Sequence, residues 1–182
     1  YARHGYIVVS QDTRGRGVSG GEFRPFHDEA NDGVDTIKAC VKLNKSNGKV
    51  GTYGFSYPGQ TQLLAAVKRP KGFTTMVPAL TSDGIYDDWT FKNGALHQAF
   101  VQGWAAYLSI SEVFRKGKLA EVRPAIQRLT GICGSYDHLP ITDHPDLPKK
   151  FNSFYYEWLK HPTYDAYWKK WQTSDKYGEI DV

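Results

Sequence analysis

The residues best suited to chemistry lie in Gly51–Gly59, which reads GTYGFSYPG and joins an apolar run to a predicted helix. Glycines beside a sharp turn let a strand and a helix pass close together, and a serine there is held strained and exposed. Ser56 is therefore our candidate nucleophile. The N–H of Tyr57, at the start of the helix, is placed to donate to an oxyanion, and proline at position 58 suits a first helical turn.

The same pattern can also arise without any functional role. In a chain with 18 glycines, a serine between glycines arises readily by chance. The strict G-x-S-x-G spacing is also absent, because Pro58 stands where the second glycine would be and Gly59 follows it. The position between a strand and a helix is what favours a functional serine.

The elements that would position this turn alternate in type. Tyr6–Gln11 is an apolar, β-branched run that predicts a buried strand, and Asp28–Leu43 has helical spacing, with acids near its start and lysines near its end. Further along, Lys49–Tyr53 predicts a strand, Tyr57–Lys68 a helix and Thr74–Leu80 a strand. This order favours an α/β fold with a parallel sheet.

A glycine-rich segment, Asp12–Phe23, follows the first predicted strand. We expect an irregular turn at the carboxyl edge of the sheet, where open α/β sheets build their sites. A phosphate-binding loop is the competing interpretation. We reject it because the segment has neither the P-loop pattern nor a G-x-G-x-x-G that opens directly into a helix.

The second half of the chain predicts helices rich in aromatic residues. Gly94–Phe114, Glu121–Leu129 and Phe151–Lys176 have helical spacing, the last interrupted at Pro162, and a loop rich in proline and aspartate spans Ser135–Pro148. Seven aromatic residues near the end of the chain could be mistaken for a stacking surface for carbohydrate or nucleic acid. Their spacing favours packing inside the helical half instead: Tyr155, Tyr156, Trp158, Tyr164, Tyr167, Trp168 and Trp171.

Composition excludes several classes of protein. The 182 residues are 40% hydrophobic with two cysteines, which argues against a disulfide scaffold or a disordered chain, and no apolar run has the roughly 20 residues that span a bilayer. The net charge of +4 is spread over short basic runs with acids between them, so we expect no nucleic-acid partner. Cys40 and Cys133 are two thiols or one bridge, and the compartment stays open.

Five motifs together resemble one known family. The segments QDTRGRGVSGGEFRPF, GTYGFSYPGQTQ, YDDWT, NGALHQAF and HPTYDAYW look like the cocaine-esterase and X-prolyl dipeptidyl-peptidase family of α/β-hydrolases, the CocE/NonD hydrolases. The similarity covers nearly the whole chain. It implies a partial α/β-hydrolase core with a nucleophile turn at residues 1–85, an inserted helical cap at 86–177, and the lead-in to a further core strand at 178–182.

The resemblance also implies residue roles. In that family the serine of the matching turn is the nucleophile, which implies Ser56, and the next residue supplies an oxyanion amide, which implies Tyr57. The family's second glycine stands where Gly59 does. The catalytic histidine and acid should lie beyond Val182, and an oxyanion tyrosine upstream of Tyr1. We therefore expect a segment of a longer serine hydrolase, inactive when isolated.

Three further residues are candidates for substrate binding. Trp89 and Trp104 resemble pocket-wall tryptophans of the cocaine-esterase branch, although such large aromatics equally suit the core of a cap. Asp88 resembles an aspartate that holds the substrate ammonium in α-amino-acid ester hydrolases, and Asp87 is an alternative. The expected substrates are small esters, amides or peptides.

None of the six histidines is our choice for the catalytic base. His138 and His144 each follow an aspartate in one loop, but such pairs usually form turns, and we expect no metal and no organic cofactor. A further alternative is a hydrolase fold without catalysis that serves as a binding module. The oligomeric state is left open.

Overall fold

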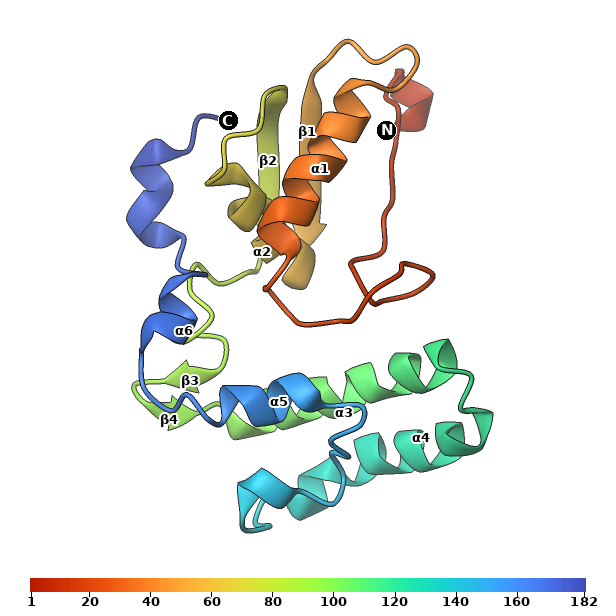
Figure 1. Cartoon of the computed structure of the whole chain (residues 1–182), viewed down its shortest axis with the longest axis vertical. Helices are drawn as coiled ribbons and strands as arrows, with labels where there is room; N and C mark the ends of the chain where they lie inside the picture. Colours follow the sequence, from red (N-terminus) through yellow and green to blue (C-terminus); the bar gives the residue numbers. More distant parts are fainter. The chain divides into compact units, whose positions relative to one another are not determined.

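The computed structural model describes residues 1–182, which form two units (Figure 1). Unit 1 comprises Tyr1–Gly15, Gly21–Gly84 and Trp171–Val182, and unit 2 comprises Arg16–Gly20 and Ile85–Lys170. The assignment of residues 1–85 to a hydrolase core and 86–177 to a cap stays a prediction.

Unit 1 is built on two parallel strands. Strand β1 (Val50–Phe55) leads into helix α2 (Tyr57–Ala66), and the chain returns in strand β2 (Phe73–Ala79), with Tyr53 opposite Val77. Helix α1 (Glu29–Val41) packs beside α2, as Figure 1 shows. The predicted strand-helix-strand order around Ser56, and the parallel pairing of its strands, are confirmed.

The core of unit 1 lies between the helices and one face of the sheet. Ile37 of α1, Ala65 and Ala66 of α2 and Phe73 of β2 form a buried cluster. The helices approach closely at Gly33, where a Cβ atom would lie 2.7 Å from that of Ala65. Burial of these apolar side chains holds α2, and with it the turn that precedes it, against the sheet.

The prediction of a buried strand at Tyr6–Gln11 is wrong. This segment forms no strand, and β1 pairs with β2 alone. Ile7, Val8 and Val9 are about half exposed, at 50%, 51% and 50%. A β-branched run raises the local preference for extended backbone, but a strand exists only where a neighbouring strand completes its hydrogen bonds. The local pattern contains no information about that neighbour.

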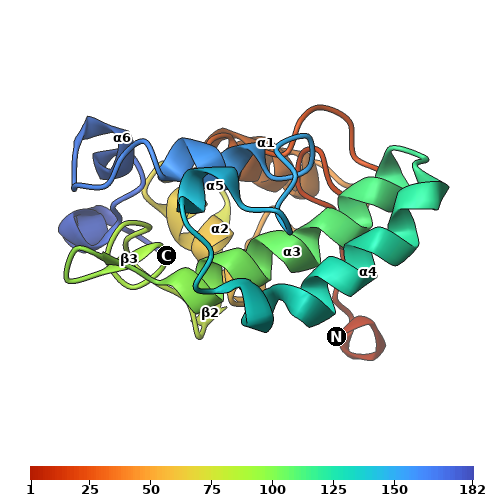
Figure 2. The ribbon, with the colours of Figure 1, turned by 90° about the horizontal axis from the view of Figure 1, so that it is seen from below.

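Unit 2 is mainly helical. Its longest helices, α3 (Gln98–Arg115) and α4 (Val122–Gly131), run side by side (Figure 2), with Val113 and Ala125 buried between them. A short antiparallel hairpin of β3 (Phe91–Lys92) and β4 (Ala95–Leu96), which the sequence did not predict, precedes α3.

The predicted helix over Phe151–Lys176 is divided. It consists of α5 (Ser153–Trp158) and α6 (Ala166–Lys169), separated around Pro162, and a 3-10 turn at Ser174–Glu179. Asp165 ends the break, because its carboxylate accepts from Tyr167 N at 2.8 Å and caps α6. The other 3-10 turns are Ala2–His4, Leu119–Glu121, Ile132–Ser135 and Ile141–Asp143.

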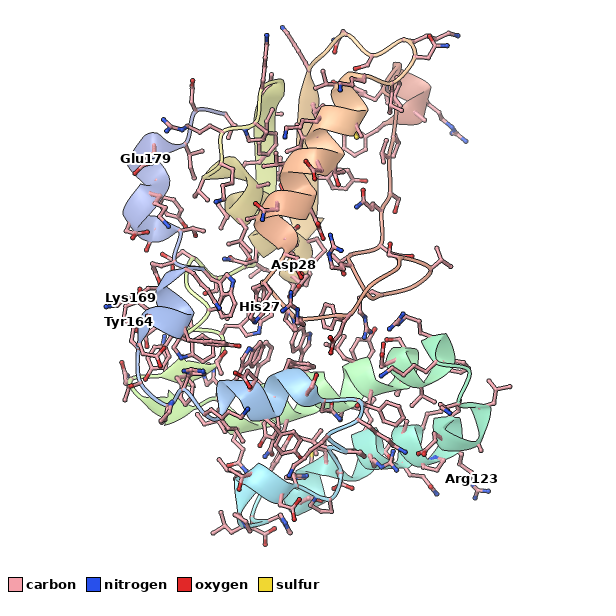
Figure 3. All side chains as sticks on the ribbon, in the orientation of Figure 1. His27, Asp28, Arg123, Tyr164, Lys169 and Glu179 are labelled. Carbon is pink, nitrogen blue, oxygen red and sulfur yellow. The ribbon has the colours of Figure 1, made fainter.

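The aromatic residues of the last third are mostly buried, but Trp171 does not pack inside the helical half: it belongs to unit 1, where its ring centroid lies 6.5 Å from that of Phe26 and 4.7 Å from that of His27. Tyr155, Trp158, Trp168 and Trp171 are at most 3% exposed. Tyr164 is 44% exposed and is labelled in Figure 3. Cys40 and Cys133 are both free thiols. No helix combines the length and the apolar character that crossing a bilayer requires.

Candidate active site

Ser56 occupies the turn between β1 and α2 in a backbone conformation that side chains rarely adopt. Its φ is +60° and its ψ is −122°, which costs on the order of 1–3 kcal/mol for a residue other than glycine. Three backbone hydrogen bonds hold it there: Ser56 N donates to Ala79 O at 2.9 Å, and Gly59 N and Gln60 N donate to Ser56 O at 2.8 and 3.2 Å. The hydroxyl has no hydrogen-bond partner within unit 1.

Two glycines make this turn sterically possible. A Cβ atom on Gly54 would lie 2.5 Å from Pro58 Cβ, and one on Gly59 would lie 2.8 Å from Thr81 Cβ. Both distances are shorter than any real contact between such atoms. The two glycines therefore let the strand, the helix and the segment after β2 meet at the serine.

Tyr57 is the first residue of α2, where backbone N–H groups point out along the helix axis. Its ring packs on the preceding loop, with ring centroids 4.8 Å from Phe26 and 6.0 Å from Phe23. Its hydroxyl donates to Glu29 Oε1 and accepts from Phe26 N at 3.1 Å. The residue after the serine is thus fixed through its side chain as well as its backbone.

Glu29 is a feature of the site that sequence reasoning missed. It was counted only among the acids at the start of α1, yet it is 7% exposed. Burial raises the pKa of Glu29, while hydrogen bonds from Tyr57 and from backbone N–H groups lower it in part. No pattern in the sequence separates this buried acid from its half-buried neighbours Asp28, which Figure 3 labels, and Asp32.

The glycine-rich segment before α1 forms irregular turns. Gly15 is buried with φ +68°, and a Cβ atom there would overlap the backbone of Phe23. The guanidinium of Arg14 ties the segment to α1, with Nε 2.9 Å from Asp32 Oδ2. This ion pair raises the pKa of Arg14. Residues of this segment thus serve to close the turn on itself and to attach it to α1.

The three predicted substrate-binding residues all lie in unit 2. Trp89 is 4% exposed and meets Trp104 edge to face, with centroids 5.7 Å apart. Trp104 also stacks on Trp158, with centroids 6.0 Å apart. Asp88 has φ +75°, its side chain is 52% exposed, and its carboxylate pairs with Lys92. The structure brings the two tryptophans together in one aromatic cluster, whereas Asp88 already has a cation beside it.

Three of the four histidines of unit 2 have a polar partner nearby, whereas the buried Nδ1 of His97 has none. His138 Nε2 lies 3.1 Å from Asp143 O and His144 Nε2 3.2 Å from Ser135 O, as expected of residues that stabilise turns. His161 Nδ1 lies 2.7 Å from the Asp165 carboxylate, whose pKa this contact lowers. No group of three or more His, Cys, Asp or Glu side chains has a metal-binding arrangement.

A strained serine between a parallel strand and a helix, in a mixed α/β fold, is typical of α/β-hydrolases. Solved structures agree on the fold. A CocE/NonD family hydrolase from Staphylococcus aureus superposes with a TM-score of 0.57 at 23% identity, over 88% of this chain and 23% of its own. An aminopeptidase from a marine sediment Thaumarchaeota archaeon gives 0.62 at 22% identity, over 100% and 31%. An α-amino acid ester hydrolase gives 0.60 at 24% identity, over 98% and 30%.

The chain belongs to the X-Pro dipeptidyl-peptidase family (S15 family), which it matches over residues 1–182. It is also 29% identical to cocaine esterase from Rhodococcus sp. (strain MB1 Bresler) over 186 residues, which is 99% of this chain and 32% of that protein. The chain therefore spans about a third of the length of this relative. The family is one of hydrolases, so the resemblance expected from the five motifs is confirmed.

Proposed function

We propose that Ser56 is the nucleophile of a serine hydrolase that cleaves ester or amide bonds, including acyl and X-Pro dipeptidyl substrates. The observation that carries the proposal is the backbone of Ser56, held at φ +60° between β1 and α2 by three hydrogen bonds and by the close approaches at Gly54 and Gly59. Local strain of this kind persists where the surrounding structure enforces it, and it clusters at active sites.

In the proposed reaction, Ser56 Oγ attacks the substrate carbonyl carbon and its proton passes to a general base. The N–H of Tyr57 donates to the oxyanion that forms. The tetrahedral intermediate then expels the alcohol or amine, which takes up the proton, and leaves an acyl-enzyme that water hydrolyses to the acid and free Ser56. The proposal takes the base and the orienting acid from outside residues 1–182, as the family resemblance implies.

Labelling with a fluorophosphonate tests the nucleophile. The full-length protein is treated with the probe and the modified peptide is located by mass spectrometry, with Ser56→Ala as the test variant and Ser10→Ala, an exposed serine of unit 1, as the control. We expect a label on Ser56 that Ser56→Ala abolishes and Ser10→Ala leaves intact. A folded protein that takes no label would refute the nucleophile and favour the binding-module alternative.

The isolated 182-residue chain tests the source of the base. We expect it to release no p-nitrophenol from an acetate ester above the level of its Ser56→Ala variant. Turnover above that level, lost in the variant, would show that this chain supplies a complete catalytic group and would overturn that part of the proposal.

The alternative of an α-amino-acid ester hydrolase requires Asp88 to exchange Lys92 for a substrate ammonium. The pair is exposed, so such exchange has a small energetic cost. The test compares an α-amino ester with its N-acetyl form in wild type and Asp88→Asn. A preference for the free amine that Asp88→Asn removes would support this alternative, and equal rates with both esters would exclude it.

A further inference from the structure

The side chain of Tyr57 is held by a small hydrogen-bonded cluster of unit 1. Its hydroxyl donates to Glu29 Oε1 and accepts from Phe26 N at 3.1 Å. The second carboxylate oxygen of Glu29 accepts from Asp28 N at 3.2 Å. The cluster therefore links the loop before α1, the first turn of α1 and the first residue of α2.

Burial and backbone strain both indicate that the surrounding structure enforces the contacts of this cluster. Glu29 is 7% exposed, and Phe26 is fully buried with φ +70° although it is not glycine. A carboxyl group removed from water is unfavourable unless hydrogen bonds compensate it, and a side chain at such a φ is strained. The buried carboxyl group of Glu29 and the strained residue Phe26 both make a hydrogen bond with the Tyr57 hydroxyl.

The contacts of the Tyr57 side chain also restrict the backbone of Tyr57. Tyr57 follows Ser56 directly, and its N–H is the donor proposed for the oxyanion. The ring is fixed at its far end by the hydroxyl contacts and along one face by Phe26, with centroids 4.8 Å apart. A rigid ring fixed in this way restricts χ1 and the position of the first turn of α2, and displacement of a catalytic group by about 1 Å can reduce a rate by about 100-fold.

We infer that Glu29 is a positioning residue: through the Tyr57 hydroxyl it holds the Tyr57 N–H in line with the oxyanion formed at Ser56. The inference rests on the proposed function, because it presupposes an acyl transfer at Ser56. It assigns to a buried acid of α1 a role in transition-state stabilisation without direct contact with the substrate.

Four variants of the full-length protein test the inference. Tyr57→Phe removes the hydroxyl and keeps the ring, Glu29→Ala removes the acceptor, Glu29→Gln keeps an acceptor oxygen, and the double variant Glu29→Ala/Tyr57→Phe measures coupling. The matched control is Asp35→Asn, which removes an acid of the same helix whose side chain is 78% exposed. Turnover is expressed per site labelled by a fluorophosphonate, so that a smaller folded fraction does not mimic a slower reaction.

We expect Tyr57→Phe and Glu29→Ala each to lower kcat per labelled site by about 10-fold, less than the 10²–10³ lost when an oxyanion donor is deleted. The inhibition constant of a phenylboronic acid, whose adduct with Ser56 is a tetrahedral anion, should rise by about the same factor. Glu29→Gln should restore both values to within about twofold of wild type, and the double variant should lose no more than the worse single variant. Asp35→Asn should match wild type.

The outcomes separate the inference from the function on which it rests. If Ser56→Ala abolishes labelling and turnover while Tyr57→Phe and Glu29→Ala leave kcat per labelled site and boronate affinity unchanged, the positioning role is wrong and the nucleophile stands. If Ser56→Ala keeps its turnover, the proposed function itself fails. Equal losses in Glu29→Gln and Glu29→Ala would also refute the role, because they would show that the hydrogen bond to Tyr57 is not what matters.

Discussion

Replacement of Gly54 by alanine should damage the nucleophile turn more than any other single methyl group added in unit 1. Gly54 is the penultimate residue of β1, and a Cβ atom there would lie 2.5 Å from Pro58 Cβ and 3.0 Å from both the carbonyl carbon and oxygen of Pro58. The atoms it meets belong to the first turn of α2. They include backbone, so no side-chain rotation relieves the overlap.

The size of the effect follows from these distances. Ordinary contact begins near 3.4 Å, so strand and helix must separate by roughly 1 Å. Overpacking of this kind destabilises a fold by about 1–3 kcal/mol. The displaced segment also carries Ser56 and Tyr57, and a shift of about 1 Å in catalytic groups can reduce a rate by about 100-fold.

The control is Gly103→Ala, in the interior of α3, where a Cβ atom would meet nothing within 4 Å. This change should stabilise the helix by about 0.5–1 kcal/mol and leave labelling unchanged. The assay is the rate of fluorophosphonate labelling of the full-length protein, together with its thermal midpoint. Gly54→Ala should label about 100-fold more slowly and melt at a lower temperature. Labelling of Gly54→Ala at the wild-type rate would refute the reasoning that this close approach sets the geometry of Ser56.

Three further results are expected. Gly59→Ala should slow labelling, and the second change Thr81→Gly should restore much of it, because Thr81 supplies the two nearest atoms, at 2.8 and 3.0 Å; equal rates in the single and double variants would contradict this. Burial raises the pKa of Glu29 above 4.5, so the stability contributed by its neutral form is full below that pH and is lost as pH rises through the higher folded value. As pH rises from acid to neutral, the thermal midpoint of wild type should therefore fall more than that of Glu29→Gln. Midpoints that change with pH in parallel in the two proteins would show that Glu29 makes no such contribution. Trp168→Phe removes the indole N–H that donates to His161 O at 2.8 Å, and should lower the free energy of unfolding by about 1–3 kcal/mol, as measured by chemical denaturation; an unchanged value would show that the bond is dispensable.

The parts of the fold that depend on local sequence were predictable. The strand, turn and helix around Ser56 are confirmed. They could be predicted because the apolar run, the glycines and Pro58 each affect the conformation of neighbouring residues. The Tyr6–Gln11 strand was predicted wrongly because strand formation needs a partner that the local pattern does not specify. The break in the last predicted helix extended further than Pro162 alone indicated, since Asp165 starts a new helix by capping it.

Of the candidate site, the sequence predicted the strand, turn and helix around Ser56 but not the residues that support them. Glu29 lies 28 residues from Tyr57 in the chain, and its role depends on the packing of α1 beside α2. In the sequence it looks like any other acid at a helix N-terminus, where a negative charge is favourable on electrostatic grounds alone. The positive φ of Phe26, which directs its N–H to the Tyr57 hydroxyl, has no signature in residue type either.

The groups that shape the turn at the proposed nucleophile all belong to unit 1, whereas the predicted substrate-binding residues belong to unit 2. Gly54, Gly59 and Glu29 act on Ser56 and Tyr57 through contacts within unit 1. The aromatic cluster of Trp89 and Trp104 makes its own contacts within unit 2. If Trp89 and Trp104 bind substrate as the sequence predicts, changes in that cluster should alter which acyl group is accepted and leave the reactivity of Ser56 toward a small fluorophosphonate unchanged. In Trp104→Phe, a changed ratio of rates on short and bulky esters with an unchanged labelling rate would support this division of roles, and parallel loss of both would refute it.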